Sequence, residues 1–364
     1  MRTLTAQDLE DILLGAAHLG TGGGGELSEG RGLIQAALDA GKTFRLVRLD
    51  EVPDEALVCT PYLLGALSPL SPAQEAAYAD LPRPARDPLL HVYRRMQAYL
   101  GAPFHGVIAC ELGGANTAAA FYCAAMMGHV ILDADPSGRA VPEVQHTTYT
   151  LAGLAPGPMV LGNAFGETFV YEGVPHDRRA EGVARALAVI SRNDIAAIDH
   201  ALPFGTLKNA LIPGTISLSL RLGQALRGCP PDQAAQVVAR IAGGHVVATG
   251  QVRCVHDWVE GGFTHGTIEI AAASGPIHIT YKNENMIARQ GDVTIATIPD
   301  LICLVDRDTG APVTNPFARA GQAVDLVCLP AHPAFATQAG VALFGPAYLG
   351  LEEAYRPYTQ RLGL

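Results

Sequence analysis

The stretch Val107-Ile108-Ala109-Cys110-Glu111-Leu112-Gly113-Gly114-Ala115-Asn116 decides the fold of the N-terminal part of this chain. Its first four residues are apolar without alternating polarity, which is typical of a strand buried on both faces of a parallel sheet. The pattern occurs again at Val130-Ile131-Leu132, which is followed by Asp133-Ala134-Asp135 and then by Gly138 and Arg139. Each strand therefore delivers carboxylates and glycines at its carboxyl end, the edge of an α/β sheet at which ligands bind.

Short apolar runs and helical patterns alternate on both sides of these two strands. Further strands are predicted at 44–49 and 56–59, and helices at 89–100 and 117–127. This alternation predicts an α/β domain with a mostly parallel sheet over residues 1–165.

After residue 165 the chain changes to helices followed by strands. Helical patterns cover 178–191, 217–227 and 232–241, and short strand-like segments with tight turns fill residues 244–330. That spacing favours a small β-barrel or sandwich. We therefore predict a second domain over residues 166–364 that contains a β-barrel, an α+β architecture overall, with a ligand site at the interface of the two domains.

The composition excludes several classes of protein. Of the 364 residues 49 % are hydrophobic, too many for a disordered chain, and a net charge of -10 disfavours nucleic-acid binding. No apolar stretch approaches the roughly 18 to 20 residues of a membrane span. The N-terminus lacks the pattern of a secretory signal, so we expect a cytoplasmic protein. The charged fraction is only 16 %, which favours a homo-oligomer.

The seven cysteines do not form a recognisable site. They are odd in number and scattered, without a CxxC pair. This argues against both a disulfide framework and a compact cysteine zinc site. Cys110, at the end of a buried strand, is an unpromising nucleophile.

A run of four glycines, Gly22, Gly23, Gly24 and Gly25, follows a predicted N-terminal helix. Consecutive glycines leave backbone N–H groups unhindered, which suits the binding of an anion or oxyanion. The run lacks the preceding strand and the G-x-G-x-x-G spacing of a dinucleotide site, and no Gly-Lys-Ser/Thr of a P-loop follows it. A tight connection between two helices is the alternative.

Three carboxylates at the two strand ends, Glu111, Asp133 and Asp135, are candidate catalytic residues. Carboxylates at such positions are costly to desolvate unless they are paired, and Arg139 is the obvious partner for one of them. Capping of the following turn explains one of the three acids, but hardly all of them. We therefore predict a functional site at this edge of the sheet.

His146 lies downstream of these acids. Together with Asp133 and Asp135 it would supply imidazole and carboxylate ligands for zinc or another divalent ion, although the spacing is looser than in H-E-x-x-H. A structural histidine or a general base is the alternative. His256 and His332 are further candidates, each more often structural when taken alone.

Two polar islands interrupt apolar surroundings farther along the chain. Lys208 precedes one of them, and the other is Lys282-Asn283-Glu284-Asn285. Turn chemistry and hydrogen bonds between domains are the favoured interpretation of both.

Several of these segments, taken in order, resemble one family, the S-methyl thiohydantoin desulfurases, which are sometimes fused to hydantoinase/oxoprolinase-type proteins. The resemblance runs nearly end to end. It implies an N-terminal α/β domain and a C-terminal domain that contains a β-barrel. The matching segments are 19–25 (LGTGGGG), 111–116 (ELGGAN), 133–135 (DAD), 138–143 (GRAVPE), 212–215 (IPGT), 261–263 (GGF), 283–285 (NEN), 296–303 (ATIPDLIC) and 345–346 (GP).

The resemblance implies a hydrolase that acts on a cyclic S-methyl isothiourea. Water attacks the ring carbon that bears the methylthio group, methanethiol leaves, and a hydantoin remains. The same resemblance places the reaction late in the breakdown of ergothioneine or its S-methyl derivative, with a hydantoin propionate as product.

This chemistry needs an activated water, and a bound metal lowers the pKa of water to about 7. Our hypothesis is a zinc ion held by Asp135 and His146 together with other ligands. Glu111 or Asp133 then serves as the base or supports the metal ligands, and Glu143 is a fourth catalytic candidate. Substrate-binding candidates are the glycines 22–25 and Asn116 as hydrogen-bond donors, and Arg139 or Lys208 for a substrate carboxylate.

Two other functions remain open at this point. One is hydrolysis of a ring amide, as in a hydantoinase or oxoprolinase. The other is a non-catalytic, ligand-binding partner of a hydantoinase. Two carboxylate clusters at strand ends argue against a simple binding module.

Overall fold

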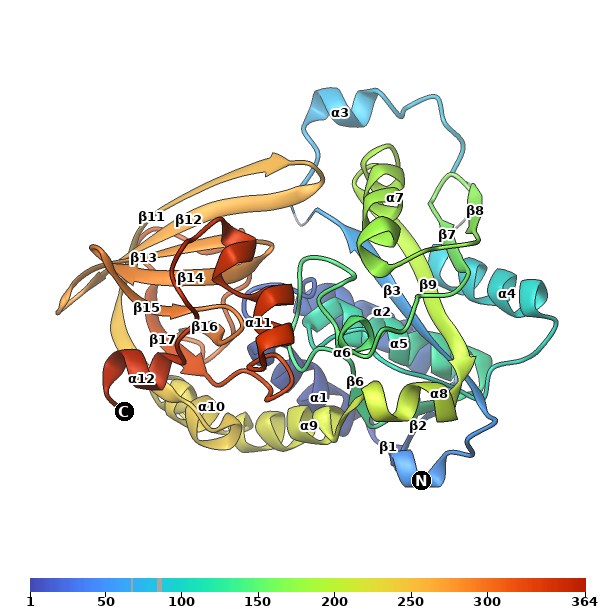
Figure 1. Ribbon diagram of the computed structural model, residues 1–364, viewed down its shortest axis with the longest axis horizontal. Coiled ribbons are helices and arrows are strands. Elements are labelled where there is room, and N and C mark those ends of the chain that lie inside the picture. The colour runs from blue at the N-terminus through green and yellow to red at the C-terminus, as the bar shows by residue number, and fades with distance from the viewer. Residues whose placement is uncertain (67, 84–86) are drawn as a thin grey trace.

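The structure is a computed structural model that describes residues 1–66, 68–83 and 87–364 (Figure 1). Four neighbouring parallel strands form one part of its N-terminal sheet. All three pairings between these strands are parallel. The predicted parallel α/β sheet is therefore confirmed for the strands that carry the motifs. In spatial order the strands are β2 (Phe44–Val47), β5 (Val130–Leu132), β4 (Gly106–Val107) and β3 (Leu57–Gly65).

Antiparallel strands extend this sheet on both sides to a total of eight strands. β1 (Arg2–Leu4) pairs with β2, and β9 (Asp194–Pro203), β7 (Met159–Gly162) and β8 (Thr168–Tyr171) continue the sheet beyond β3. The predicted division of the chain at residue 165 falls between β7 and β8 of this one sheet. The division into two domains stays a prediction.

The helices of the N-terminal part lie where the sequence predicts them. α4 (Pro88–Leu100) and α5 (Gly114–Met127) confirm the predicted helices at 89–100 and 117–127. Nearly all of α5 is buried, and it contacts both α2 (Leu27–Asp39) and β3, as expected for an apolar helix enclosed by its neighbours. Thr5 is the N-cap of α1 (Ala6–Leu19), and its Oγ1 accepts a hydrogen bond of 3.1 Å from the backbone N–H of Asp8.

The second half of the chain begins with helices and continues as one antiparallel sheet of seven strands. α7 (Asp177–Val189), α9 (Thr215–Leu226) and α10 (Ala234–Ala242) confirm the helices predicted there. In spatial order the strands are β15 (Val293–Thr297), β14 (Glu284–Gln290), β13 (Gly275–Lys282), β12 (Phe263–Ala272), β11 (His245–Glu260), β17 (Ala323–Leu329) and β16 (Leu301–Asp306).

This C-terminal sheet curls but does not close into the predicted barrel. Its edge strands β15 and β16 do not pair with each other among the residues that the structure describes. The predicted strand region, 244–330, is confirmed, but the prediction that these strands close into a barrel is wrong. Strand spacing along the sequence indicates which strands are neighbours, but it does not determine whether the first and last strands meet.

Short elements connect the two halves. A two-stranded sheet of β6 and β10 places the carboxyl end of β5 against the start of α9. The bounds of the remaining elements are α3 (Pro72–Ala76), β6 (Ala134–Asp135), α6 (Thr148–Leu151), α8 (Phe204–Leu207), β10 (Ile212–Pro213), α11 (Gln338–Phe344) and α12 (Tyr358–Leu362).

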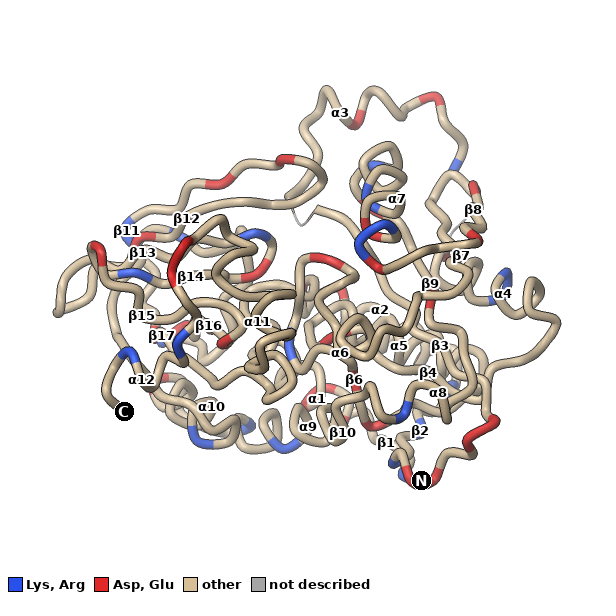
Figure 2. Tube along the Cα trace, viewed as in Figure 1, with Lys and Arg blue, Asp and Glu red and all other residues tan. Residues whose placement is uncertain are grey.

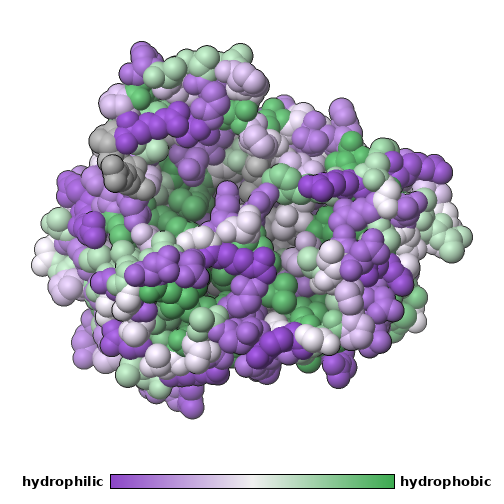
Figure 3. Space-filling model, turned by 180° about the vertical axis from the view of Figure 1, so that it is seen from behind, coloured by the Kyte–Doolittle hydropathy of each residue, from purple (hydrophilic) through white to green (hydrophobic). Residues whose placement is uncertain are grey.

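Acidic segments lie at the junction of the two sheets as well as at the periphery (Figure 2). Seen from behind, the surface is hollowed beneath the segment that carries α3, and apolar residues lie in the hollow (Figure 3). Within the described ranges, no helix combines the length and the apolar character that crossing a membrane requires. The homo-oligomer and the cytoplasmic location stay predictions.

Candidate active site

A cavity of about 860 Å³ lies between the two halves of the molecule. Residues from β3, β9, the glycine run and the start of α5 line it on the N-terminal side, and Asn283 and Glu284 line it from the C-terminal sheet. The predicted residues Gly24, Gly25, Glu111, Asn116 and Glu143 are among its walls. The position agrees with the expectation of a ligand site where the domains meet.

Glu111 is buried in the cavity wall, with only 5 % of its surface exposed. Its Oε1 accepts a hydrogen bond of 2.7 Å from Nδ2 of Asn116, and its Oε2 accepts one of 2.8 Å from the backbone N–H of Val141. Burial raises the pKa of Glu111 to about 7. The two hydrogen bonds and the positive charge of Arg139 lower this pKa, but they do not outweigh burial. A carboxyl with this pKa can accept and release a proton at neutral pH.

Glu284 is the second buried carboxyl of the cavity, although its sequence context favours turn chemistry and hydrogen bonds between domains. It begins β14 and is 2 % exposed. The backbone N–H of Gly24 donates to it, while its Oε2 has no hydrogen-bond partner among the residues that the structure describes. Burial, followed by the negative charge of Glu111, raises the pKa of Glu284 well above its usual value.

Glu111 and Glu284 therefore form a carboxyl pair that favours one proton between them. Two negative charges in a buried site oppose each other, so ionisation of one carboxyl disfavours ionisation of the other. Glu111 accepts two N–H donors, which stabilise its carboxylate form. Glu284, with an oxygen that has no partner, is the better holder of the proton. The pair thus combines a base and an acid in one cavity.

The glycine run supports this pair through its backbone. The carbonyl of Gly24 accepts from the N–H groups of Ala115 and Asn116 at 3.0 and 3.1 Å, which fixes the run against the start of α5. Gly24 has a φ of +75°, and a Cβ there would lie 2.5 Å from Cα of Gly113. A Cβ on Gly23 would lie 1.9 Å from Oε1 of Glu284. The run therefore brings backbone close to a protein carboxyl group.

Asp133 and Asp135 hold local structure beside the cavity. Asp133 accepts hydrogen bonds from the backbone N–H of Ser217 at 2.8 Å and from its hydroxyl at 2.6 Å, in the first turn of α9. Asp135 Oδ2 accepts from the N–H groups of Ser137 and Gly138 at 2.8 and 2.7 Å. Neither aspartate is among the described residues that line the cavity.

Asp135 nevertheless keeps one feature of a functional acid. It is completely buried, and burial raises its pKa to about 7, although hydrogen bonds from Gly138, Ser137 and the side chain of Thr215 lower it. Its charge also raises the pKa of Glu111.

The two cations predicted to bind a substrate carboxylate lie elsewhere. Arg139 is buried and donates to the carbonyls of Ala140, Pro299 and Asp300 and to Oγ1 of Thr21. Lys208 forms an ion pair of 2.7 Å with Asp54 at the surface. Neither is among the lining residues in the part of the chain that is described.

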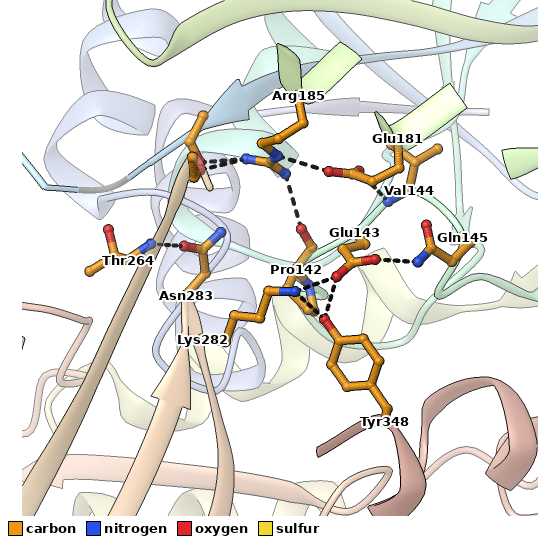
Figure 4. A network of polar contacts seen from close by, with 12 residues as sticks. Pro142, Glu143, Val144, Gln145, Glu181, Arg185, Thr264, Lys282, Asn283 and Tyr348 are labelled. Atoms are coloured by element: carbon orange, nitrogen blue, oxygen red, sulfur yellow. Dashed lines mark hydrogen bonds and ion pairs between the residues drawn. The ribbon is translucent and has the colours of Figure 1, made fainter. Parts of the chain in front are cut away.

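Glu143 joins the two halves of the molecule at the cavity wall (Figure 4). It accepts hydrogen bonds from Nζ of Lys282 and from the hydroxyl of Tyr348. Burial opposes its ionisation, but the charge of Lys282 and the hydrogen bonds from Lys282 and Tyr348 outweigh burial, and the pKa of Glu143 is lowered to about 2. Glu143 is therefore ionised and bound to Lys282 and Tyr348, across the contact between the two halves of the molecule.

Arg185 on α7 makes the neighbouring contact in the same view (Figure 4). It pairs with Glu181 at 2.8 Å and donates to the carbonyls of Gly65, Pro142 and Gly262. These bonds tie together β3, the segment before His146 and the tip of the β11–β12 hairpin.

His146 lies in aromatic surroundings. Its ring centroid is 4.3 Å from that of Phe344 and 4.7 Å from that of Tyr348, and neither ring nitrogen has a hydrogen-bond partner. Burial lowers its pKa to about 3, so the ring is neutral. No three His, Cys, Asp or Glu side chains within the described ranges are placed to hold a metal ion together. A zinc site takes at least three ligands from the protein, so Asp135 and His146 would need a further donor. The zinc ion stays a prediction.

The other predicted histidines and the cavity cysteine show no catalytic arrangement. The ring of His256 lies 5.7 Å from that of Trp258 on β11, and Nδ1 of His332 accepts from the N–H of Ala334 at 3.3 Å. Cys110 lines the cavity, but burial raises its pKa well above the usual value. A thiol in that state is a poor nucleophile.

Asp199 and His200 on β9 form a further polar group in the cavity wall that the sequence analysis missed. Nδ1 of His200 lies 2.9 Å from Oδ1 of Asp199, and the hydroxyl of Tyr62 donates to Oδ2 of Asp199 at 2.8 Å. An adjacent Asp-His pair in an apolar strand was the only available signal for it.

Comparisons with known proteins agree with this architecture. A family model described as S-Me-THD-like, N-terminal domain, matches residues 7–173, and one described as S-Me-THD-like, C-terminal domain, matches residues 175–358. An X-ray crystal structure of a protein from Chromobacterium violaceum is similar to this chain at 22 % sequence identity and a TM-score of 0.78. The alignment covers 98 % of this chain and 100 % of that chain, and at this identity it shows the fold alone. No curated protein matches the sequence.

Proposed function

The chain belongs to the S-Me-THD-like family, and from this premise we propose that it is a hydrolase of a cyclic S-methyl isothiourea, namely an S-methyl thiohydantoin. The products are methanethiol and a hydantoin. The observation that carries the proposal is the buried pair of Glu111 and Glu284 in the cavity between the two halves. Hydrolysis at a C=N carbon needs one group that accepts a proton and one that donates a proton, and this pair supplies both.

In the proposed mechanism the Glu111 carboxylate takes a proton from water as its oxygen attacks the ring carbon that carries sulfur. The C=N bond opens, and the carboxyl of Glu284 gives its proton to the ring nitrogen. The tetrahedral intermediate then re-forms a C=O bond and expels methylthiolate. Two protons are then available, the one that Glu111 took from water and the one on the hydroxyl group of the intermediate. Glu111 gives its proton to the methylthiolate, which leaves as methanethiol, and the hydroxyl proton goes to Glu284. The pair ends in its starting state.

The low polarity of the site supports this division of roles. Glu111 and Glu284 are at most 5 % exposed, so bulk water does not screen the interactions that give the two carboxyls different pKa values. Asn116 cannot rotate freely, since its Oδ1 accepts from the N–H of Leu63 at 2.9 Å while its Nδ2 holds Glu111. The base is thereby held in one orientation.

The test is thiol release from synthetic S-methyl thiohydantoin, measured with a colorimetric thiol reagent. We expect stoichiometric methanethiol and hydantoin. Ring opening without thiol release would instead indicate hydantoinase- or oxoprolinase-like amide hydrolysis, and ligand binding without turnover would indicate a non-catalytic partner. A propionate substituent and a place in ergothioneine-type breakdown are part of the proposal and are tested with the propionate-bearing ring.

The pH dependence of kcat/KM is expected to be bell-shaped. Activity rises with pH as Glu111, whose pKa is about 7, loses its proton and becomes a base. It falls again at higher pH as Glu284, whose pKa is raised well above its usual value, loses the proton that it donates. Initial rates from about pH 5 to about pH 9 measure both limbs. A profile without an ascending limb near neutral pH would contradict the assignment of Glu111.

Zinc remains an untested prediction, and the proposed mechanism does not need it. Since Asp135 and His146 are not joined by a third donor within the described ranges, we expect thiol release to survive incubation with a strong chelator. Elemental analysis of the purified protein before and after chelation is the control. Loss of activity together with loss of a stoichiometric metal, and recovery when zinc is added, would restore the zinc mechanism.

A further inference from the structure

Strand β9 carries a bulge at the cavity wall. His200 and Ala201 together oppose Cys59 of β3, and His200 has a φ of +42°, which is rare for any residue but glycine. In a regular strand the side chains of Asp199 and His200 would point to opposite faces. The bulge lets them meet, with Nδ1 of His200 2.9 Å from Oδ1 of Asp199. Backbone strain of this kind is found where a side chain is positioned for function.

His200 lies between two carboxylates. Its Nε2 is 3.8 Å from Oδ1 of Asp177, and its ring stacks on Tyr149 with the centroids 4.2 Å apart. Burial lowers the pKa of His200, but Asp199 and Asp177 more than offset this and raise it. Because its Nδ1 lies within hydrogen-bond distance of Oδ1 of Asp199, the ring of His200 holds this carboxyl group in one orientation.

Asp199 in turn determines the direction of the Tyr62 hydroxyl. The hydroxyl donates its proton to Oδ2 of Asp199 at 2.8 Å. Burial raises the pKa of Tyr62 well above its usual value, so this proton stays on the phenol. A hydroxyl has one proton, and Tyr62 therefore has only lone pairs left to offer a ligand.

We propose that Asp177, His200 and Asp199 fix the Tyr62 hydroxyl as a hydrogen-bond acceptor in the cavity wall, and that it binds an N–H group of the substrate ring. This inference rests on the proposed function, whose substrate and product rings carry an N–H next to a carbonyl. Tyr62 and Asp199 both line the cavity that holds Glu111 and Glu284. A ligand carbonyl at this position would find no hydrogen-bond donor, because the Tyr62 hydroxyl already donates its proton to Asp199. The cavity wall therefore favours a ligand N–H over a ligand carbonyl.

The ring N–H between two carbonyl carbons of a hydantoin is its strongest donor, and methylation at that nitrogen removes it. The experiment compares the affinities of hydantoin and 3-methylhydantoin by calorimetry, without turnover. We expect the wild-type protein to bind hydantoin about tenfold more tightly, the effect of about one hydrogen bond. In Tyr62→Phe the ratio of the two affinities is expected to fall to about one.

His200→Asn tests the positioning role separately, because asparagine tolerates the left-handed backbone at this site. Without the imidazole ring, the carboxyl group of Asp199 loses the contact that orients it. Tyr62 is then free to turn its own proton into the cavity, so the ratio is also expected to fall. Tyr149→Phe is the matched control, since Tyr149 lines the same cavity and stacks on His200 but makes no bond to Asp199 among the described contacts. A purely structural role would weaken both ligands equally.

Each outcome decides the inference. A ratio that drops in Tyr62→Phe and His200→Asn but not in Tyr149→Phe supports it. A ratio near ten in a folded Tyr62→Phe protein overturns it while leaving the hydrolase proposal intact. If neither ring binds the wild-type protein at all, the proposed function and the inference both fail.

Discussion

Replacement of Glu111 by Gln is expected to lower kcat by about 1000-fold, within the range that general acid–base catalysis contributes. The amide has nearly the same shape, but it cannot take a proton from water. It can still accept one of the two hydrogen bonds that Glu111 receives from Asn116 and Val141. Loss of activity should therefore occur in a folded protein with a nearly unchanged thermal midpoint.

Thiol release and circular dichroism on the same samples measure these two effects. Glu29→Gln is the matched control, since Glu29 lines the same cavity from α2 but is exposed to solvent. We expect the control to change kcat by less than about twofold, as for a surface charge. Substantial turnover by Glu111→Gln would exclude Glu111 as the base and bring Asp135 forward as the alternative carboxylate.

Glu111 can be predicted as a candidate site residue from the sequence, whereas Glu284 cannot, for a physical reason. Glu111 follows a buried strand of a parallel sheet, and the carboxyl ends of such strands predict a site without any knowledge of the rest of the molecule. Glu284 begins an antiparallel strand, where a carboxylate is usually a solvated turn residue. Its role follows only from the docking of the C-terminal sheet on the glycine run, a long-range contact that local patterns do not encode.

Asp133 illustrates the opposite limit. Asp133 comes directly after β5 and Glu111 comes four residues after β4, and in the sequence both acids follow an apolar run. Asp133 nevertheless accepts two hydrogen bonds from Ser217 in the first turn of α9. Capping and catalysis use the same residue types, and the partner that distinguishes them lies far away in the sequence. Arg139 interacts with Glu111 and Glu284 through its charge, but its hydrogen bonds go to main-chain carbonyls and to Thr21.

Replacement of Gly23 by Ala should have the second-largest effect, a loss of about 100-fold in kcat/KM together with about 1–3 kcal/mol of stability. A Cβ at this position would lie 1.9 Å from Oε1 and 2.5 Å from Cδ of Glu284, so the carboxyl group must move. A displaced Glu284 no longer lies where burial and then the charge of Glu111 raise its pKa. Its proton is then lost at lower pH, and the descending limb of the pH profile should shift downward.

Gly32→Ala separates this effect from a general cost of adding a methyl group near the cavity. Gly32 lies in α2 and lines the same cavity, but a Cβ there meets nothing within 4 Å. Since alanine favours helices over glycine, this variant should be more stable by about 0.5–1 kcal/mol and keep its activity. If both variants behave alike in thermal unfolding and thiol release, the glycine run is only a connection between α1 and α2. If Gly23→Ala alone loses activity, the run is glycine-rich because a carboxyl group of the active site occupies the space that a side chain would need.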